Sequence, residues 1–410
     1  MARISLYTLT SPLHDEQAVE AVTKEFLHSL NIDFEYRSAD YADYGSAPLS
    51  LIYVRTGGTE GVFRRLLPSL LPKSSQPFYL LTSGKSNSLA ASMEILSFLR
   101  QQGLKGEILH GSQAYVNHRI ELLARVGEAR QRLRGCRLGI VGEPSDWLIS
   151  SVYDASVVRE KLGMELVSIP MEELLDEFHA LAQADVSEEV ADLSAHVAPL
   201  RRQDATAVKE SLNDATRLYF ALKNIAERYE LQGLTIRCFD LLTAVRNTGC
   251  IALARLNSEG LVAGCEGDVP TMISMMIART LIGVSGFQAN PAHISTETGE
   301  VLFAHCTIPL AMTERYELDT HFESGIGVGI RGYVKEGPVT IFKTSGRLDR
   351  FFAAEGTLEA CQSKSDLCRT QQVIRLSRPD EASYFLRNPI GNHHVVLPGH
   401  VKELLEVMFE

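Results

Sequence analysis

The feature that most constrains the fold is a change in the pattern of apolar residues near Ser285. Before that residue, apolar runs such as Leu49 to Val54 and Pro77 to Leu81 alternate with amphipathic stretches such as Ser88 to Gln101. Alternating strands and helices indicate a parallel sheet covered by helices. After Ser285, short β-type runs follow one another between glycine and proline turns, which is typical of an antiparallel sheet or barrel.

The length of the chain, 410 residues, favours two or three domains over one. A long helix predicted from Gln113 to Arg134 leads out of the first α/β unit, and a strand at Arg137 to Gly142 opens a second. We therefore predict an N-terminal α/β domain over residues 1–134 and a second α/β domain over residues 135–285. A β-rich, barrel-like domain over residues 286–410 follows and closes with a terminal helix.

Composition argues against two classes of partner. The formal net charge of -11 is unfavourable for a nucleic-acid-binding surface, which needs basic residues to displace counterions. No apolar run approaches the ~18 residues of a membrane span, and the start lacks the apolar core of a signal peptide. Seven cysteines without a CxxC pair suggest reduced thiols in the cytoplasm. We therefore expect a cytoplasmic protein that binds neither nucleic acid nor membrane.

Nucleotide-binding motifs are incomplete. Gly84-Lys85-Ser86 precedes a predicted helix, but Tyr79 stands where a phosphate-binding loop requires its first glycine. The glycines at 325, 327, 329 and 332 lie in a β-rich region and do not open a helix, so they do not form a dinucleotide fingerprint. A nucleotide cofactor is therefore not predicted.

Two carboxylates open an apolar helical stretch in the sequence Cys265-Glu266-Gly267-Asp268. Asp268 could simply cap that helix, where its charge is favourable against the helix dipole. Glu266 follows apolar residues, and a buried carboxylate needs a partner, of which a metal ion is one. Carboxylates and imidazoles that are widely spaced in sequence are the usual components of a divalent-metal site.

Several histidines lie near predicted strands in the last third of the chain. His393 and His394 precede the apolar Val395-Val396-Leu397, and two adjacent imidazoles make a poor core but good ligands or acid–base groups. His305 follows Val301-Leu302-Phe303 at the end of a predicted strand. His293 follows a predicted proline turn, where a structural role is equally reasonable.

These residues resemble motifs of the L-fucose/L-arabinose isomerase superfamily. The resemblance is clearest from about Ile236 to Gly346 and again from Pro389 to Leu404. It places Glu266 at the family's metal-binding glutamate, His305 at a metal-binding histidine of the arabinose-type members, and His393 at the last histidine ligand. The resemblance therefore implies a metal site formed by these three residues.

The segment Asn392-His393-His394 leaves a choice of ligand. Either imidazole could bind the metal, and the fucose-type pattern of Asn-His followed by Gly-His, here Gly399-His400, favours His393. Asn392 and His394 are then predicted to bind substrate.

The resemblance also implies an architecture and an activity. Two Rossmann-like α/β layers precede a β-barrel-like domain, with the site at their junction, and members are commonly trimers or hexamers. They interconvert aldoses and ketoses with a divalent ion, usually manganese. We therefore predict a homo-trimeric or homo-hexameric isomerase of carbohydrate metabolism, which uses Mn²⁺ or Mg²⁺ and an ene-diol intermediate. The alternative is a non-catalytic sugar or sugar-phosphate binding protein on the same fold, and the sugar itself is not predicted.

One residue departs from the family pattern. Asn290 stands where the family has a second acidic ligand, which is also expected to act as an acid–base group. Asparagine can offer a carbonyl oxygen to a metal but cannot carry a proton. We predict Glu266 as ligand and base, His305 as ligand or acid, and Asn290 as a residue that orients the sugar or metal. Asp268, His305 or His293 could compensate for the missing carboxylate.

Overall fold

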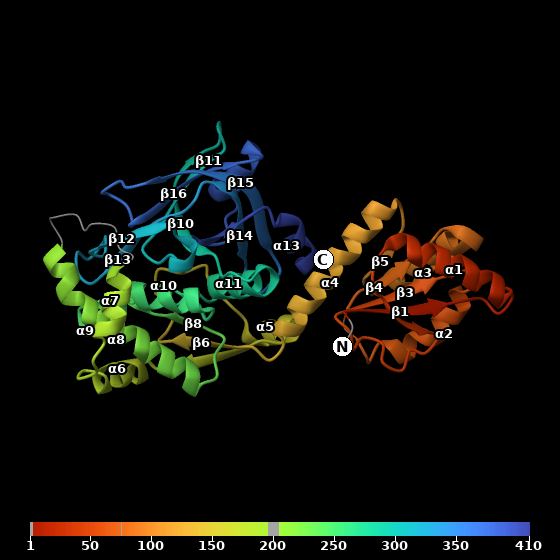
Figure 1. Cartoon of the computed structure of the whole chain (residues 1–410), viewed down its shortest axis with the longest axis horizontal. Coiled ribbons are helices and arrows are strands. Elements are labelled where there is room, and N and C mark those ends of the chain that lie inside the picture. The colour runs from red at the N-terminus through yellow and green to blue at the C-terminus, as the bar shows by residue number, and fades with distance from the viewer. Residues whose placement is uncertain (1–2, 75, 196–204) are drawn as a thin grey trace. The chain divides into compact units, whose positions relative to one another are not determined.

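The computed structural model describes residues 3–74, 76–195 and 205–410. Backbone contacts divide the chain into two compact units, residues 1–131 and 132–410, which are described separately below (Figure 1). The division of the second unit into two domains stays a prediction. Within the described residues, no helix is both long enough and apolar enough to cross a bilayer.

The first unit is an α/β layer whose parallel sheet has the strand order β2-β1-β3-β4-β5. Its central strand, Leu49–Val54, is buried along its whole length, as expected for a parallel strand covered on both faces. The alternation of strands and helices seen in the sequence therefore gives the predicted α/β class. The elements of this unit are β1 (Ile4–Leu9), α1 (Glu16–Leu30), β2 (Glu35–Ser38), β3 (Leu49–Val54), α2 (Glu60–Leu70), β4 (Phe78–Leu81), η1 (Lys85–Asn87), α3 (Ser88–Gln101), β5 (Gly106–Leu109) and α4 (Gln113–Leu133), which runs past the unit's end.

The second unit opens with another parallel sheet, in the order β7-β6-β8-β9. Helix α11 begins directly after β9 and packs against that sheet and against strands β14 and β17 of the following barrel. Its burial on all sides explains its apolar sequence. The elements are β6 (Arg137–Val141), α5 (Ala155–Leu162), β7 (Glu165–Ile169), α6 (Met171–Ala180), α7 (Ser187–Ala195), α8 (Ala205–Arg228), β8 (Gly233–Ile236), α9 (Cys238–Val245), α10 (Cys250–Glu259), β9 (Val262–Gly264) and α11 (Val269–Ile282).

The rest of the second unit forms a closed antiparallel barrel in the order β10-β11-β16-β15-β14-β17 (Figure 1). A separate hairpin, β12–β13, lies in the chain between β11 and β14. The predicted barrel-like C-terminal region is therefore confirmed. The elements are β10 (Phe287–Ser295), β11 (Glu300–His305), η2 (Leu310–Met312), β12 (Arg315–Asp319), β13 (Gly329–Tyr333), β14 (Gly337–Thr344), β15 (Phe351–Gln362), β16 (Thr370–Leu376), η3 (Pro379–Ala382), α12 (Ser383–Arg387), β17 (His394–Pro398) and α13 (Lys402–Phe409).

The proline turn predicted before His293 is wrong, because β10 continues through this segment. The pairing of β10 with β11 shifts register between Pro291 and His293. Proline has no N–H for the ladder, so an irregularity there allows the strand to continue. His293 is exposed on this strand, whereas Asn290 is aligned with Ala304, the residue before His305.

Candidate active site

The predicted site residues meet where the parallel sheet of the second unit adjoins the barrel. Glu266 follows β9, and Trp147 and Cys238 follow β6 and β8, so all three lie beyond the carboxyl edge of the sheet. Ligands of open parallel sheets bind at this edge. From the barrel, His305 ends β11 and His393 immediately precedes β17.

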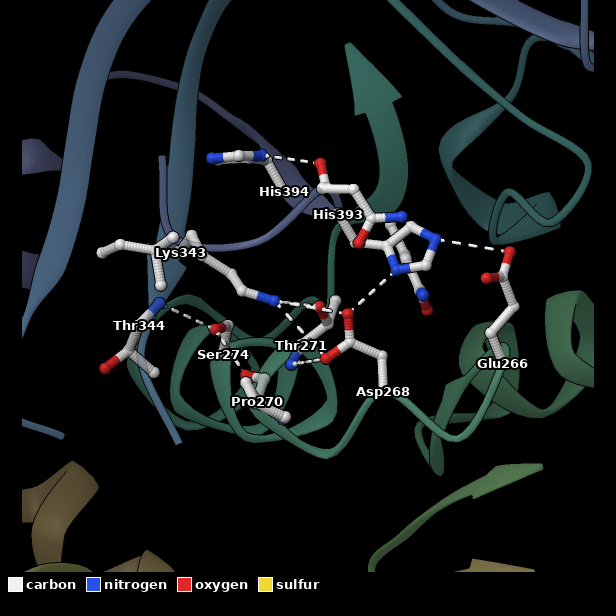
Figure 2. Close-up of polar contacts among 12 residues, drawn as sticks. Glu266, Asp268, Pro270, Thr271, Ser274, Lys343, Thr344, His393 and His394 are labelled. Carbon is white, nitrogen blue, oxygen red and sulfur yellow. Dashed lines mark hydrogen bonds and ion pairs between the residues drawn. The ribbon is translucent and has the colours of Figure 1, made fainter. Parts of the chain in front are cut away.

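The Glu266 carboxylate lies between two imidazoles. Its Oε1 is 3.6 Å from Nε2 of His305 and 3.4 Å from Nε2 of His393, and the two rings are 5.3 Å apart between centroids. Its other oxygen, Oε2, accepts a 2.7 Å hydrogen bond from the indole N–H of Trp147. The tertiary structure therefore brings together the three residues for which the sequence predicted metal binding (Figure 2 shows Glu266 and His393).

Asp268 fixes the orientation of His393 from the opposite side of the ring (Figure 2). Its Oδ2 is 2.9 Å from Nδ1 of His393, and its Oδ1 accepts from the backbone N–H of Thr271 at 2.9 Å. It thus caps α11, as one interpretation of the sequence had it, and also holds the imidazole. A carboxylate on the far nitrogen of a ligating histidine is the usual way in which proteins orient such a ring.

Lys343 is a buried cation that sequence reasoning missed. Its Nζ lies 3.4 Å from Oδ2 of Asp268 and contacts the Thr271 hydroxyl, and all three side chains are fully or almost fully buried (Figure 2). The signal was present, because Lys343 ends the apolar run Val339-Thr340-Ile341-Phe342. A lysine in such a strand needs an anion, and only the fold shows that Asp268 is that anion.

The backbone at Glu266 is in an unusual conformation. Glu266 and Gly267 have φ angles of 65° and 67°, and a Cβ on Gly267 would lie 2.8 Å from the Pro144 Cα. The Glu266 carbonyl accepts from the Ser145 N–H at 3.0 Å, and Cys238 Sγ accepts from the Glu266 N–H at 3.3 Å. A glutamate keeps a left-handed backbone conformation only when surrounding contacts enforce it, and such conformations cluster at functional sites.

Charge interactions shift the pKa values of the cluster in opposite directions. Burial alone would lower the pKa of His393, but the carboxylates of Glu266 and Asp268 raise it to about 9. Burial alone would raise the pKa of Glu266, but His393 and His305 bring it well below its usual range. Without a metal ion, the cluster is therefore a carboxylate that faces a protonated His393 near neutral pH.

We expect Mn²⁺ binding to release a proton from His393 and therefore to strengthen with pH. Affinity should rise about tenfold per pH unit between about pH 6.5 and about pH 8.5, because a metal ligand must be neutral imidazole. The stability of the metal-free protein should instead fall as the pH rises. The folded pKa of His393 exceeds the unfolded value, so its stabilising contribution is present below pH 6.5 and is lost as the pH rises through about 9.

Calorimetric titrations at several pH values, in buffers that differ in their heat of ionisation, would count the released proton. Thermal unfolding of the metal-free protein at the same pH values supplies the second measurement. An affinity that is independent of pH over this range would show that His393 is not a ligand.

A pocket opens beside this cluster, with a volume of about 40 Å³ available to the centres of water-sized molecules. Besides Glu266 and His305, it exposes Asn290, the imidazole of His321 and the carboxylate-bearing Glu323. The remaining lining residues are apolar, hydroxyl or thiol side chains: Cys238, Phe239, Leu242, Thr248, Cys250, Cys265, Cys306 and Cys368. Cys265 and Cys306 are also buried, as free cysteines commonly are.

Asn290 and the remaining predicted residues lie in different environments. Asn290 lines the pocket, and its buried Oδ1 has no hydrogen-bond partner among the described residues. His394 is buried away from it, with Nε2 3.0 Å from the Tyr384 hydroxyl, and burial lowers its pKa to about 3. Asn392 is exposed. Neither Asn392 nor His394 is among the described lining residues, so their predicted role in substrate binding stays a prediction.

The side chains of the cluster fit a divalent cation. His393 Nε2 is buried and forms no hydrogen bond within the described structure, although it lies 3.4 Å from Glu266. Buried polar atoms normally have partners, so Asn290 Oδ1 is available to a ligand, and so is His393 Nε2 once the imidazole has lost its proton. One ligand atom each from Cys265, Glu266 and His305 also lies within 4.8 Å of the others. Carboxylate and imidazole donors suit manganese or magnesium, and a thiolate would suit a softer ion.

The fold and the site together define a class, an α/β protein with a closed barrel and a carboxylate–imidazole cluster at the junction. Residues 152–283 match the family described as the L-arabinose isomerase central domain. This match includes Glu266 and Asp268 and ends within the turn after α11. The resemblance to the L-fucose/L-arabinose isomerase superfamily that the sequence motifs predicted is therefore confirmed.

Curated relatives agree with this assignment at modest identity. The chain is 26% identical over 272 residues to a sulfoquinovose isomerase from Alkalicoccus urumqiensis, and the aligned segment covers 63% of this chain and 59% of the relative. It is 27% identical over 225 residues to a sulfoquinovose isomerase from Priestia aryabhattai, and here the aligned segment covers 53% of this chain and 49% of the relative. A protein of the same name from Clostridium sp. (strain MSTE9) is 25% identical over 229 residues. The matches thus span only half to three-fifths of the length of these relatives.

Proposed function

We propose that the chain is a metal-dependent aldose–ketose isomerase that acts on a monosaccharide or derivative through an ene-diol intermediate. The observation that carries this proposal is the Glu266 carboxylate held between His305 and His393 beside the pocket. The matches to an L-arabinose isomerase domain and to sulfoquinovose isomerases support it. Because the relatives are named for sulfoquinovose, that sugar is the first substrate to test.

Glu266, His305 and His393 would hold the metal, with Mn²⁺ or Mg²⁺ as the ions that this donor set prefers. When bound, such an ion polarises the sugar's carbonyl and adjacent hydroxyl and so acidifies the C–H between them. Asp268 keeps His393 turned toward Glu266, and Trp147 holds the second oxygen of Glu266. These contacts fix the ligand atoms before substrate arrives.

The protein's own groups then move the carbon-bound proton. Glu266 is the proposed base that takes the proton from C2 and returns it to C1. Asn290, which lines the same pocket and whose buried amide oxygen has no hydrogen-bond partner among the described residues, would orient the sugar. His305 is turned toward Glu266 while its Nδ1 lies 2.9 Å from the Thr307 hydroxyl, an arrangement that suits a ligand or an acid.

Two measurements test this function. Calorimetry should show binding of a single Mn²⁺ per chain. With sulfoquinovose and a panel of aldoses in heavy water, NMR should show a ketose product with deuterium at C1 and recovered aldose with deuterium at C2. A sugar-binding protein without catalysis would raise the unfolding temperature in the presence of sugar and exchange no proton. Absence of both Mn²⁺ binding and exchange would contradict the proposal.

The proposal includes the oligomeric state and the cellular compartment that were expected from the sequence. The superfamily resemblance favours a homo-trimer or homo-hexamer, and light scattering on the purified protein measures this directly. The cysteines of the described chain are all free, which is compatible with the reducing cytoplasm that their number and spacing suggested.

A further inference from the structure

Aldose–ketose isomerisation relocates two protons, and if Glu266, His305 and His393 all hold the metal, the residues assigned so far provide for only one. The carbon-bound proton moves from C2 to C1, and the hydroxyl proton moves from O2 to O1. Glu266 is the group proposed for the first transfer. Asn290, which stands at the family's second acidic position, cannot accept or release a proton. A second titratable group must therefore reach the pocket from elsewhere in the chain.

His321 lies at the right place for this task. It sits on the connection between β12 and β13 and lines the same pocket as Glu266 and Asn290. Its ring lies 5.9 Å from that of Phe239 between centroids, and the Phe239 ring lies 4.8 Å from that of Trp147, the residue that holds Glu266; both pairs are edge-to-face. One row of side chains therefore connects His321 with the metal-binding carboxylate.

The imidazole is held in a fixed orientation by its own loop. His321 Nδ1 lies 3.0 Å from the Ser324 hydroxyl, so Nε2 is the nitrogen left for a substrate. The backbone N–H of His321 bonds to the Ile326 carbonyl at 3.2 Å, and its carbonyl accepts from the Gly325 N–H at 2.9 Å. Arg369 anchors the start of the loop through a 2.7 Å bond from its Nε to the carbonyl of Thr320, the residue before His321. A group held in this way is positioned before the substrate binds.

Other titratable groups near the barrel have different assignments. His394 is enclosed by aromatic rings and bonded to Tyr384, and His400 lies 3.2 Å from the Gly356 carbonyl. His305 faces Glu266 as a proposed ligand. Glu323, two residues after His321, also lines the pocket but is exposed. Apart from the five cysteines of the lining, His321 and Glu323 are the remaining titratable groups of the pocket, and His321 is the more enclosed of the two.

We propose that His321 is the second proton-transfer group of the isomerisation and carries the hydroxyl proton from O2 to O1. This inference rests on the proposed isomerase function and assigns a role at the same site. The O2–H bond breaks as an N–H bond forms at Nε2, and that N–H bond then breaks as O1–H forms. No electrons enter or leave, and the imidazole returns to its starting state.

The charge state of His321 near neutral pH is compatible with this role. Burial lowers the pKa of His321, and Arg369 lowers it further, against the opposing carboxylates of Glu323 and Glu266. The net direction is below the usual value of 6.5. The ring is therefore neutral and able to accept a proton at pH 7.

The test uses the full-length, Mn²⁺-loaded His321→Gln variant with sulfoquinovose, or with the aldose that the wild type turns over fastest. Turnover to the ketose should fall by ~10²–10⁴-fold, the usual contribution of a general acid–base group. Exchange of the C2 proton with heavy water should fall much less, because Glu266 still forms and reprotonates the ene-diol. The ratio of exchange to turnover should therefore rise, which damage to the fold would not cause. Mn²⁺ affinity should match that of the wild type.

His179→Gln is the matched control, because His179 is exposed on α6 and is not among the residues that line the pocket. It should leave both rates unchanged. If His321→Gln lowers exchange and turnover by the same factor, or neither, the assignment is wrong. If Glu323→Gln raises the ratio and His321→Gln does not, the carboxylate is the carrier. A wild type that neither exchanges nor isomerises any aldose would instead overturn the isomerase function itself.

Discussion

Replacing Glu266 with glutamine is expected to weaken Mn²⁺ binding by roughly 100-fold or more and to reduce isomerisation below detection. Substitutions that only disturb the surroundings of a metal ligand already cost 10–100-fold in affinity. Glutamine keeps the shape of the side chain but removes the charge that faces His305 and His393. The same change removes the proposed base, so the two losses should occur together.

Trp147 offers a direct optical measurement of this effect. It is the only tryptophan in the chain, and its indole N–H donates to Glu266. Mn²⁺ should therefore change the intrinsic fluorescence of the wild type and saturate at the stoichiometry found by calorimetry. In Glu266→Gln the fluorescence response should disappear.

Glu172→Gln is a suitable control, because it removes the same charge from an exposed residue of α6. Its Mn²⁺ titration should match that of the wild type. Normal Mn²⁺ affinity in Glu266→Gln would exclude this carboxylate as a ligand, and the metal-dependent mechanism would then lose its main support.

Replacing Lys343 with methionine is expected to destabilise the metal-free protein by ~3–5 kcal/mol, which is the usual cost of removing one partner of a buried ion pair. Lys343 and Asp268 are both buried, and the remaining carboxylate would keep only His393 and Thr271 as polar partners. The effect belongs to the charge and not to packing, because methionine fills most of the volume of the lysine stem.

Urea unfolding of the single variant and of the double variant Asp268→Asn/Lys343→Met separates charge from packing. The double variant should regain part of the lost stability, because it leaves no buried charge unpaired. It should still bind Mn²⁺ more weakly, since asparagine holds His393 less strongly than a carboxylate does. Equal losses in the single and double variants would mean that packing, and not the ion pair, is what Lys343 provides.

The sequence predicted most of the architecture because the period of the apolar residues reports local structure. Helix α3 and strand β3 have the bounds that their patterns indicated, and the change near Ser285 marks the start of the barrel. The sequence did not predict the course of β10. A proline such as Pro291 normally interrupts a strand, and the irregular pairing that accommodates it depends on β11. Local patterns carry no information about which strand lies next to which.

The candidate site, too, was predicted from the sequence only in part. Glu266, His305 and His393 could be selected from the sequence, because carboxylates and imidazoles beside apolar runs are costly unless they have partners. Nothing local indicates that Asp268 bonds both to the start of α11 and to a histidine 125 residues away, or that Lys343 balances its charge. His321 was overlooked because it lies in a polar loop, where a histidine is ordinarily a surface residue.

The sequence by itself thus determined that α/β layers are followed by a barrel, and it singled out the residues proposed to bind a metal. These properties depend on side-chain chemistry and on spacing along the chain. The tertiary structure alone decided that Glu266 lies between two imidazoles, that a buried lysine balances Asp268, and that His321 faces the same pocket. Such distances arise from the closure of the barrel onto the sheet, which joins segments that are far apart in the chain.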